Sequence, residues 1–252
     1  MQIGKLWAIV FALPHEAKAF LPKFEIASTT TFHGSKVYEG SWKQRPVLLL
    51  QTGMGPKRAY QATSFLLNHY PVSHLVSTGY GGALNGELQV GDGVIATSLL
   101  DCRHPKEIIR PNFPNPEALA TSMKSLGFPL HAGRFVQSPR PVLASKEKEE
   151  MAINFKGLEV DMESFGVLKA ANEKEKITSL AIRFIVDEQG VSLPDTSSFL
   201  DKEGGVHVSP LVREAVRRPK ILVALPQLDR WARIARRHME KAMDTLMNLS
   251  LS

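Results

Sequence analysis

Short apolar runs of strand length alternate along this chain with segments of helical periodicity. The runs are nearly continuous, which is typical of strands buried on both faces of a sheet. We therefore expect one α/β domain over residues 1–252, with a central mixed, mostly parallel sheet flanked by helices. The expected strands are residues 6–12, 36–40, 46–52, 74–78, 92–98, 130–137, 157–161 and 178–186. The expected helices are residues 15–21, 56–69, 115–126, 146–153, 163–174, 209–217 and 226–248.

Two segments lack either periodicity and are expected to be loops. Residues 103–116 contain four prolines, which interrupt regular structure. Residues 188–208 are polar and are broken by Pro194. A connection of this length is more typical of a mobile lid than of a tight turn. Its apolar residues could line a channel for an apolar ligand; they include Val191, Leu193, Phe199 and Leu200.

The composition bears on the size of the core and on the cellular compartment of the protein. Hydrophobic residues make up 43% of the 252 residues, enough for a sizeable core, and the net charge is +6. The single cysteine, Cys102, excludes an internal disulfide framework and fits a reducing cytosol. The apolar run 6–13 has no small-x-small cleavage site after it, so we expect a buried strand and a cytoplasmic protein.

Acidic residues follow three of the expected strands. Glu16 follows the first strand, Asp161 and Glu163 follow the segment from Gly157, and Asp187 closes the run 179–186. Taken singly, each acid is more readily explained as a loop residue or as a favourable charge at a helix N-terminus. Their shared position matters because ligands of open α/β sheets bind at the carboxyl ends of strands. Grouped carboxylates suit a reaction in which positive charge develops on a sugar.

A glycine-rich segment, Ser77–Leu84, follows the strand at 74–78. Its glycines allow the backbone to approach a ligand closely, and its N–H groups could bind an anion or a sugar hydroxyl. It matches neither the dinucleotide-binding fingerprint nor a phosphate-binding P-loop, so it could equally be an ordinary turn.

The eight histidines give no metal-binding pattern. His15 is the one histidine beside a candidate acid, Glu16, and is a possible neighbour of the site. We therefore expect no metal and no cofactor.

The expected helix at 226–248 is amphipathic and basic. Apolar residues recur at three- and four-residue spacing from Leu228 to Leu249, and arginine and lysine occupy the other faces. The simplest interpretation is a helix packed on the domain with a solvated basic face. Weak contact with an anionic membrane is the alternative. Nucleic-acid binding is not expected, because no recognition module is visible.

The order of these motifs resembles one known family. An N-terminal strand ending in an acid precedes Thr-Gly-x-Gly-Gly, Val-Gly-Asp at 90–92, Val-Asp-Met-Glu-Ser at 160–164 and Ile-Arg-x-Ile-x-Asp at 182–187. This resembles the nucleoside phosphorylase and nucleosidase superfamily over about residues 6–190. Ser138–Val142, the Arg-Arg-Pro at 217–219 and the long basic helix resemble its hopanoid-associated branch.

The resemblance implies a role for each candidate residue. Asp187 corresponds to the acid that protonates the purine leaving group, Glu163 to the acid that binds the ribose hydroxyls, and Glu16 to the acid that positions water. The other expected substrate-binding positions are Met162, Asp161, Tyr80, Gly81, Gly82, Val142 and Arg183. The resemblance also implies a homo-oligomer.

Two departures from the family pattern affect the expected reaction. Phosphorylases have an arginine where this chain has Ser77 and a serine where it has Tyr80, and both hold phosphate. Their absence favours water as nucleophile. Many nucleosidases stack the base on a phenylalanine near position 141, where this chain has proline, although the Val142 backbone could still contact the base edge.

The expected activity is hydrolysis of an adenine nucleoside with a bulky apolar 5′ group, such as adenosylhopane. Alternatives are a methylthioadenosine/adenosylhomocysteine or futalosine nucleosidase, a phosphate-dependent phosphorylase, or a noncatalytic nucleoside- or lipid-binding protein.

Overall fold

The computed structural model describes residues 6–174, 176–194 and 220–248, with side chains from 225 onward in the last range. The expected helix at 209–217 and residues 195–208 of the expected lid lie outside the described residues.

Within the described residues, ten strands form one sheet. Their bounds are β1 Leu6–Phe11, β2 Phe24–Phe32, β3 Ser35–Trp42, β4 Arg45–Gln51, β5 Val72–Ala83, β6 Gly93–Asp101, β7 Ile108–Ile109, β8 Leu130–Gln137, β9 Glu159–Asp161 and β10 Thr178–Asp187.

Strand pairing makes the sheet mixed. The order is β10-β6-β8-β9-β5-β1-β4-β3-β2, with β7 paired to β6 and β10 paired to β5 as well. This last pairing closes β5, β10, β6, β8 and β9 into a ring. Parallel pairing joins β4, β1, β5 and β10, whereas the β2-β3-β4 meander is antiparallel. The sheet is thus more evenly mixed than the sequence predicts.

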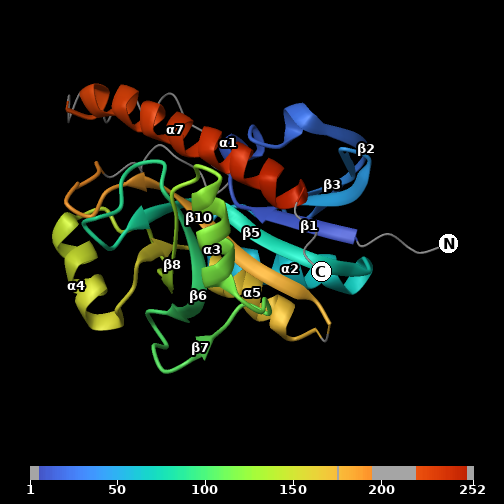
Figure 1. The fold of residues 1–252 in the computed structure, drawn as a ribbon, viewed down its shortest axis with the longest axis horizontal. Helices are drawn as coiled ribbons and strands as arrows, with labels where there is room; N and C mark the ends of the chain where they lie inside the picture. Colours follow the sequence, from blue (N-terminus) through green and yellow to red (C-terminus); the bar gives the residue numbers. More distant parts are fainter. Residues whose placement is uncertain (1–5, 175, 195–219, 249–252) are drawn as a thin grey trace.

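Helices cover both faces of this sheet (Figure 1). Their bounds are α1 Pro14–Ala17, η1 Leu21–Lys23, α2 Pro56–His69, α3 Pro116–Ser125, α4 Ser145–Phe155, α5 Ser164–Asn172 and α7 Lys220–Asn248. Helices α3 and α7 share one apolar core with the sheet, and α2 and α5 share a second core on the opposite face. The expected α/β fold with a central sheet flanked by helices is confirmed.

Alternation along the central strands separates the two cores. In β1, Trp7, Ile9 and Phe11 pack with α7, while Ala8 and Val10 pack with α2. A strand buried on both faces needs apolar residues at every position, which explains its unbroken apolar run. Burial of these side chains stabilises the fold by about 1.5–3 kcal/mol per large apolar residue.

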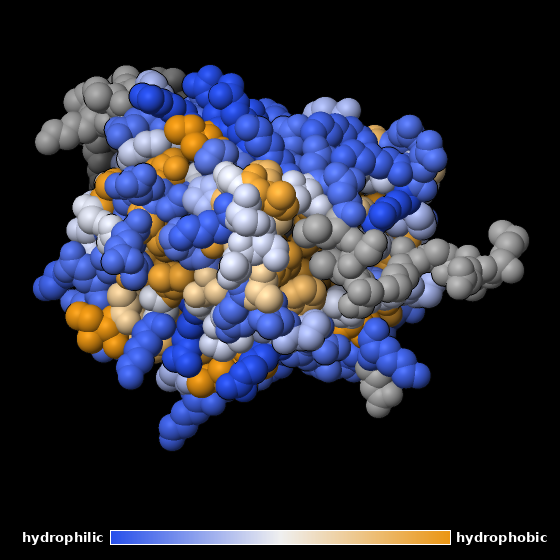
Figure 2. All heavy atoms as spheres, in the orientation of Figure 1, coloured by the Kyte–Doolittle hydropathy of each residue, from blue (hydrophilic) through white to orange (hydrophobic). Residues whose placement is uncertain are grey.

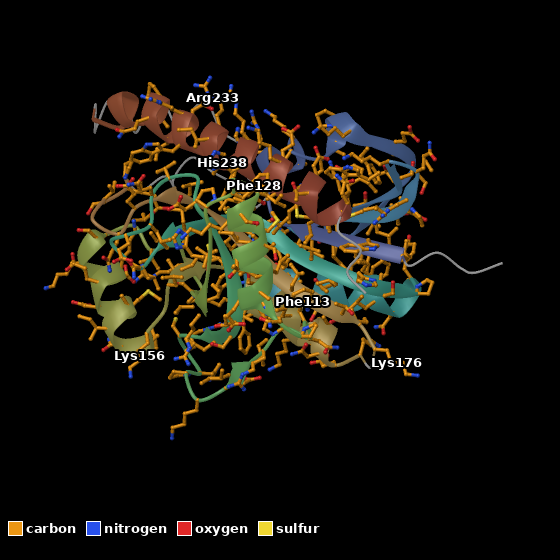
Figure 3. The ribbon with its side chains drawn as sticks, viewed as in Figure 1. Phe113, Phe128, Lys156, Lys176, Arg233 and His238 are labelled. Atoms are coloured by element: carbon orange, nitrogen blue, oxygen red, sulfur yellow. The ribbon has the colours of Figure 1, made fainter. Side chains whose placement is uncertain are left out.

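The inner face of α7 packs on the sheet. Its buried residues are Ala235, Met239, Ala242, Met243, Leu246 and Met247. Charged and polar side chains cover its outer side (Figure 2). Arg233 points outward, whereas His238 points towards the sheet, where its Nδ1 lies 2.7 Å from the Gly91 carbonyl (Figure 3). This arrangement agrees with the simple interpretation of the amphipathic pattern. No helix in the described ranges is long and apolar enough to cross a membrane.

Several boundaries differ from those predicted. Strand β2 is absent from the prediction because its exposed, threonine-rich sequence has no apolar alternation. The helix expected at 15–21 ends at Ala17. Helix α7 begins at Lys220 rather than at Pro226, so Pro226 lies inside the helix and not in its first turn. The loop expected at 103–116 contains the short strand β7 and the start of α3.

The glycine-rich segment is not a turn. Strand β5 continues through it to Ala83, because Gly79, Gly81 and Gly82 pair with β10 on one side. On the other side, Gly82 and Ala83 pair with β9. Two-sided pairing therefore overrides the local tendency of glycine to form turns.

Candidate active site

A cavity of about 250 Å³ lies where the carboxyl ends of β1, β4, β8, β9 and β10 meet β5. It receives all three candidate acids, Glu16, Glu163 and Asp187. The other lining residues are Ala12, Leu13, Met54, Tyr80, Gly81, Gly82, Arg140, Pro141, Val142, Leu143, Val160, Asp161, Met162, Val186 and Leu193. A larger hollow of about 670 Å³ lies beside α2 and α5, but it lacks this grouping of buried acids among its described lining residues.

A β-bulge directs Asp187 into the cavity. The β10–β5 register shifts between Ile185 and Asp187, so that Asp187 lies opposite Gly82. Val186 and Asp187 consequently both line the cavity, although neighbouring strand residues normally point to opposite faces. Gly82 leaves the space that the carboxyl group occupies, since a Cβ there would lie 3.3 Å from Asp187 Oδ2.

The Asp187 carboxyl is almost fully buried and has one cationic partner. Its Oδ2 forms a short ion pair with the Lys148 ammonium. Burial raises the pKa of Asp187, as the apolar approach strand predicts, and Lys148 acts against that rise. A proton can therefore remain on Asp187 at a higher pH than on an exposed aspartate.

Asp161 and Glu163 have different roles despite their proximity. Asp161 Oδ1 accepts hydrogen bonds of 3.1 Å from the backbone N–H groups of Glu163 and Ser164, at the start of α5. The ordinary capping interpretation therefore holds for Asp161. Glu163 Oε1 accepts a 2.8 Å hydrogen bond from Gly55 N, across the cavity wall. Burial raises the pKa of Glu163 to about 8, and Arg183 acts against that rise.

Glu16 is held by three backbone amides. Its Oε2 accepts hydrogen bonds from Ala12 N at 2.9 Å and Leu13 N at 2.8 Å, and its Oε1 accepts one from Tyr80 N at 2.8 Å. Burial raises the pKa of Glu16, and Arg183 and the amides act against this rise. A carboxylate has about four acceptor positions, so one remains for a further donor.

Arg183 lies beneath the cavity and organises the acids around it. Its side chain is 1% exposed. Nε donates to Asp161 Oδ2 at 2.5 Å and to Ser164 Oγ at 2.9 Å, and Nη1 donates to the Thr78 carbonyl at 2.5 Å. Burial acts to lower the pKa of Arg183, but the surrounding carboxylates, Asp161 foremost, raise it above its ordinary value.

Glycine is required at two positions for this packing. Gly79 has φ +144°, and a Cβ there would overlap Arg183 Nη1 and Glu16 Oε1. A Cβ at Gly81 would overlap Glu159 Oε1. The glycine-rich segment therefore lets buried charged side chains pass close to the backbone of β5.

Glu159 is a further buried acid near this network, beside Glu16, Asp161, Glu163 and Asp187. Neither of its carboxyl oxygens has a hydrogen-bond partner within the described part of the chain. Burial raises its pKa well above the ordinary value, and the nearby Asp161 charge adds to that rise. Glu159 therefore keeps its proton to a higher pH than an exposed glutamate does.

Tyr80 connects the cavity wall to α7. Its hydroxyl lies 3.0 Å from His15 Nδ1, and His15 Nε2 lies 3.5 Å from Arg236 Nη1. Burial lowers the pKa of His15, and Arg236 lowers it further. A neutral His15 accepts from Arg236 at Nε2 and so donates to Tyr80 from Nδ1. His15 is thus a neighbour of the site, behind Tyr80.

The structure brings together nearly all the candidate residues. Glu16, Tyr80, Gly81, Gly82, Val142, Asp161, Met162, Glu163 and Asp187 line the cavity. Arg183 does not line it, because its donors face Asp161, Ser164 and the β5 backbone. Its contact with substrate stays a prediction, and in the structure Arg183 contacts Asp161, an acid that does line the cavity.

Two features were missed at the sequence level. Lys148 lies in a run of charged residues, which is typical of a solvated helix face. The Gly53–Gly55 segment is a weak sequence signal, yet it places Met54 in the cavity and Gly55 N against Glu163. Across the described ranges, no group of three or more His, Cys, Asp or Glu side chains could hold a metal ion.

The geometry can be compared with that of known proteins. The sequence profile of the phosphorylase superfamily matches residues 7–215. The chain belongs to the phosphorylase superfamily. This membership agrees with the acids at strand ends and with the expected nucleosidase or phosphorylase type of enzyme.

Curated relatives within the phosphorylase superfamily match only part of the chain. The 5′-methylthioadenosine/S-adenosylhomocysteine nucleosidases of Bacillus thuringiensis (strain Al Hakam) and Bacillus cereus (strain AH187) are 33% identical over 92 residues. This stretch covers 36% of the chain and 40% of each relative.

Solved phosphorylase superfamily structures share the fold over almost the whole chain. The Neisseria meningitidis 5′-methylthioadenosine/S-adenosylhomocysteine nucleosidase, in complex with methylthio-immucillin-A, has a TM-score of 0.72 and 18% identity, with 95% of this chain and 96% of that chain covered. The Helicobacter pylori futalosine hydrolase has a TM-score of 0.71 and 16% identity, with coverage of 97% and 100%. At these identities the likeness establishes the fold.

Proposed function

We propose that this protein cleaves the N-ribosidic bond of an adenine nucleoside by hydrolysis. The observation that carries the proposal is the convergence of Glu16, Glu163 and Asp187 on one cavity. Cleavage of an N-ribosidic bond passes through an oxocarbenium-like sugar, which nearby carboxylates stabilise. The likeness to nucleosidases supports the same reaction class.

Asp187 is the proposed general acid at the base end of the cavity. The pocket around it is apolar, with Val142, Val186 and Leu193 among its lining residues. A neutral purine leaves more readily when a ring nitrogen is protonated, and general acid catalysis contributes about 10²–10⁴-fold. The C–N bond breaks with its electron pair going to the base, while the Asp187 proton passes to the base nitrogen.

Glu163 and Glu16 are the proposed groups at the sugar. Glu163 lies beside Met162 and Met54, where it could accept hydrogen bonds from the ribose hydroxyls. Glu16 has one acceptor position left after its three backbone bonds, which suits a bound water. That water forms the new C–O bond at the anomeric carbon, and its proton passes to Glu16.

The charges around the cavity favour water over phosphate. Ser77 lies within β5 and is buried, with its Oγ 3.5 Å from Arg183 Nη2. The Tyr80 hydroxyl is held by His15. Among the described lining residues, Arg140 is the one cation, and it pairs with Glu147 at 2.6 Å. A phosphate dianion would therefore meet acidic groups with little compensation.

The test is base release in phosphate-free buffer. Adenosine and methylthioadenosine are incubated with the protein, free adenine is measured, and the sugar product is identified with and without added phosphate. We expect adenine and the free sugar in both conditions, which is ribose from adenosine and methylthioribose from methylthioadenosine. Obligatory formation of the sugar 1-phosphate, with no release in phosphate-free buffer, would show a phosphorylase instead.

The finer proposal concerns the 5′ group. We infer that it is large and apolar, as in adenosylhopane of hopanoid biosynthesis. The resemblance of residues 138–142 and 217–219 to the hopanoid-associated branch supports this, as do the apolar lining residues Leu13, Met54 and Leu193. Exposed basic residues along α7 could bring the protein to an anionic bilayer; they are Arg230, Arg233, Arg237 and Lys241.

We expect base release from a 5′-alkyl adenosine with a long chain to exceed that from methylthioadenosine. We also expect binding to anionic vesicles at low salt, because each basic residue near the surface contributes about 1 kcal/mol. Co-sedimentation at low and high salt measures this, with the four basic α7 residues replaced by glutamine as the control. A preference for methylthioadenosine without vesicle binding would leave the small-substrate nucleosidase.

A further inference from the structure

Lys148 is an unusual residue in its surroundings. Helix α4 begins Ser-Lys-Glu-Lys-Glu-Glu, and its neighbours Lys146, Glu149 and Glu150 are exposed. The Lys148 side chain is nevertheless 0% exposed. Burying an ammonium group is costly unless it is paired and hydrogen-bonded, so its environment must supply strong partners.

Three acceptors meet the three donors of the Lys148 ammonium. Nζ donates to the Glu188 carbonyl at 2.8 Å and to the Val191 carbonyl at 2.9 Å, and it forms the short ion pair with Asp187 Oδ2. An ammonium group has three N–H bonds, so its hydrogen-bonding capacity is filled. The two carbonyls belong to the segment that follows β10 and leads to Leu193 in the cavity wall.

Few other charges act on Asp187. Among the described residues, the Lys148 ammonium reaches it from α4, and Glu159 of β9 also interacts with its charge. On β5 the facing residue is Gly82, which carries no charge. Burial favours the neutral form of Glu159, whereas the Lys148 ammonium contacts the Asp187 carboxyl directly, so Lys148 is the main charge acting on Asp187.

We propose that Lys148 is a positioning residue for Asp187: it fixes Oδ2, leaves Oδ1 for the base and stabilises the carboxylate that remains after proton transfer. This inference rests on the proposed function. When the Asp187 proton passes to the base nitrogen, the carboxylate forms next to an ammonium that is already in place. The same ammonium ties residues 188–191 to α4, so the acid and this part of the cavity wall are held together.

The test compares Lys148→Met, Lys148→Arg and the control Lys146→Met, which removes an exposed lysine from the same helix. The pH dependence of kcat and kcat/KM for base release is measured for each. Activity requires protonated Asp187, so the ionisation of Asp187 sets the alkaline limb of the pH–rate profile, where the rate falls as pH rises. Removing the cation raises the Asp187 pKa, so in Lys148→Met this limb moves up by about one pH unit or more. Its kcat falls by about 10-fold or more, because the new carboxylate lacks its partner.

Lys148→Arg keeps the positive charge, so its alkaline limb stays near that of wild type, and Lys146→Met is unchanged in both readouts. If Lys148→Met does not fold, Lys148→Gln carries the same expectation, because it keeps donors for the two carbonyls but no charge. If Lys148 were merely structural, its replacement by methionine or glutamine would lower stability or rate without moving the alkaline limb. An unmoved alkaline limb in Lys148→Met or Lys148→Gln would therefore overturn the proposal.

The failure of the proposed function gives a different result. Wild-type protein that releases no base would refute the nucleosidase activity and, with it, a positioning role in that reaction. An active wild type, with an inactive Asp187→Asn and an unmoved limb in the Lys148 variants, would refute the role of Lys148 alone.

Discussion

Replacing Asp187 with asparagine is expected to lower the turnover of base release by about 100-fold or more, equivalent to about 3 kcal/mol of activation free energy. The asparagine has nearly the same shape but carries no acidic proton. The pocket around Asp187 is suited to holding a proton, because burial raises the pKa of this carboxyl. A substitution that preserves shape while removing the proton therefore isolates the chemical role.

Turnover is measured by adenine release under saturating substrate, and folding is followed by thermal unfolding of the same samples. Asp229→Asn is a matched control, because Asp229 lies on the exposed side of α7 and pairs with Arg233. We expect wild-type turnover in this control. An Asp187→Asn protein that retains near wild-type turnover would remove Asp187 from the mechanism.

Replacing Arg183 with methionine is expected to reduce the free energy of unfolding by about 3–5 kcal/mol, because it leaves the buried Asp161 carboxylate without its cation. The free energy of unfolding of Arg183→Lys should lie between those of wild type and Arg183→Met. Its single ammonium cannot reach Asp161, Ser164 and the Thr78 carbonyl together. Arg110→Met removes an exposed arginine and should change stability by less than about 0.5 kcal/mol.

The loss in Arg183→Met should grow with pH. Arg183 acts to lower the pKa of Glu163, so its removal raises that pKa further. Above about pH 8, where the wild-type Glu163 carboxyl ionises, the folded variant still binds its proton, so its stability falls further below that of wild type as pH rises. Urea denaturation at about pH 7 and about pH 9.5 measures both effects. A loss below about 1 kcal/mol at both values would show that the acids do not depend on Arg183.

The fold was largely predictable because buried strands carry an unbroken apolar pattern. Strands β1, β4 and β10 follow from such runs. Strand β2 could not be found this way, because it is exposed and polar and is held by backbone pairing with β3. The pairing of β10 with β5 could not be predicted either, because it joins segments about a hundred residues apart in the sequence.

The site was predictable in its acids and not in what surrounds them. Glu16, Glu163 and Asp187 follow strands, so shared position at a sheet edge identifies them. The bulge that turns Asp187 into the cavity has no sequence signal of its own. Lys148 and Arg183 reach the acids only through tertiary packing. The sequence around a charged residue in a helix or strand does not identify the partner that it contacts in the fold.

A crystal structure with adenine bound would test the central claim most directly. We predict adenine in the cavity between Val142 and Asp187, with a ring nitrogen within hydrogen-bonding distance of the Asp187 carboxyl. Adenine found instead in the hollow beside Tyr60 and Lys174, with this cavity free of base, would contradict the account.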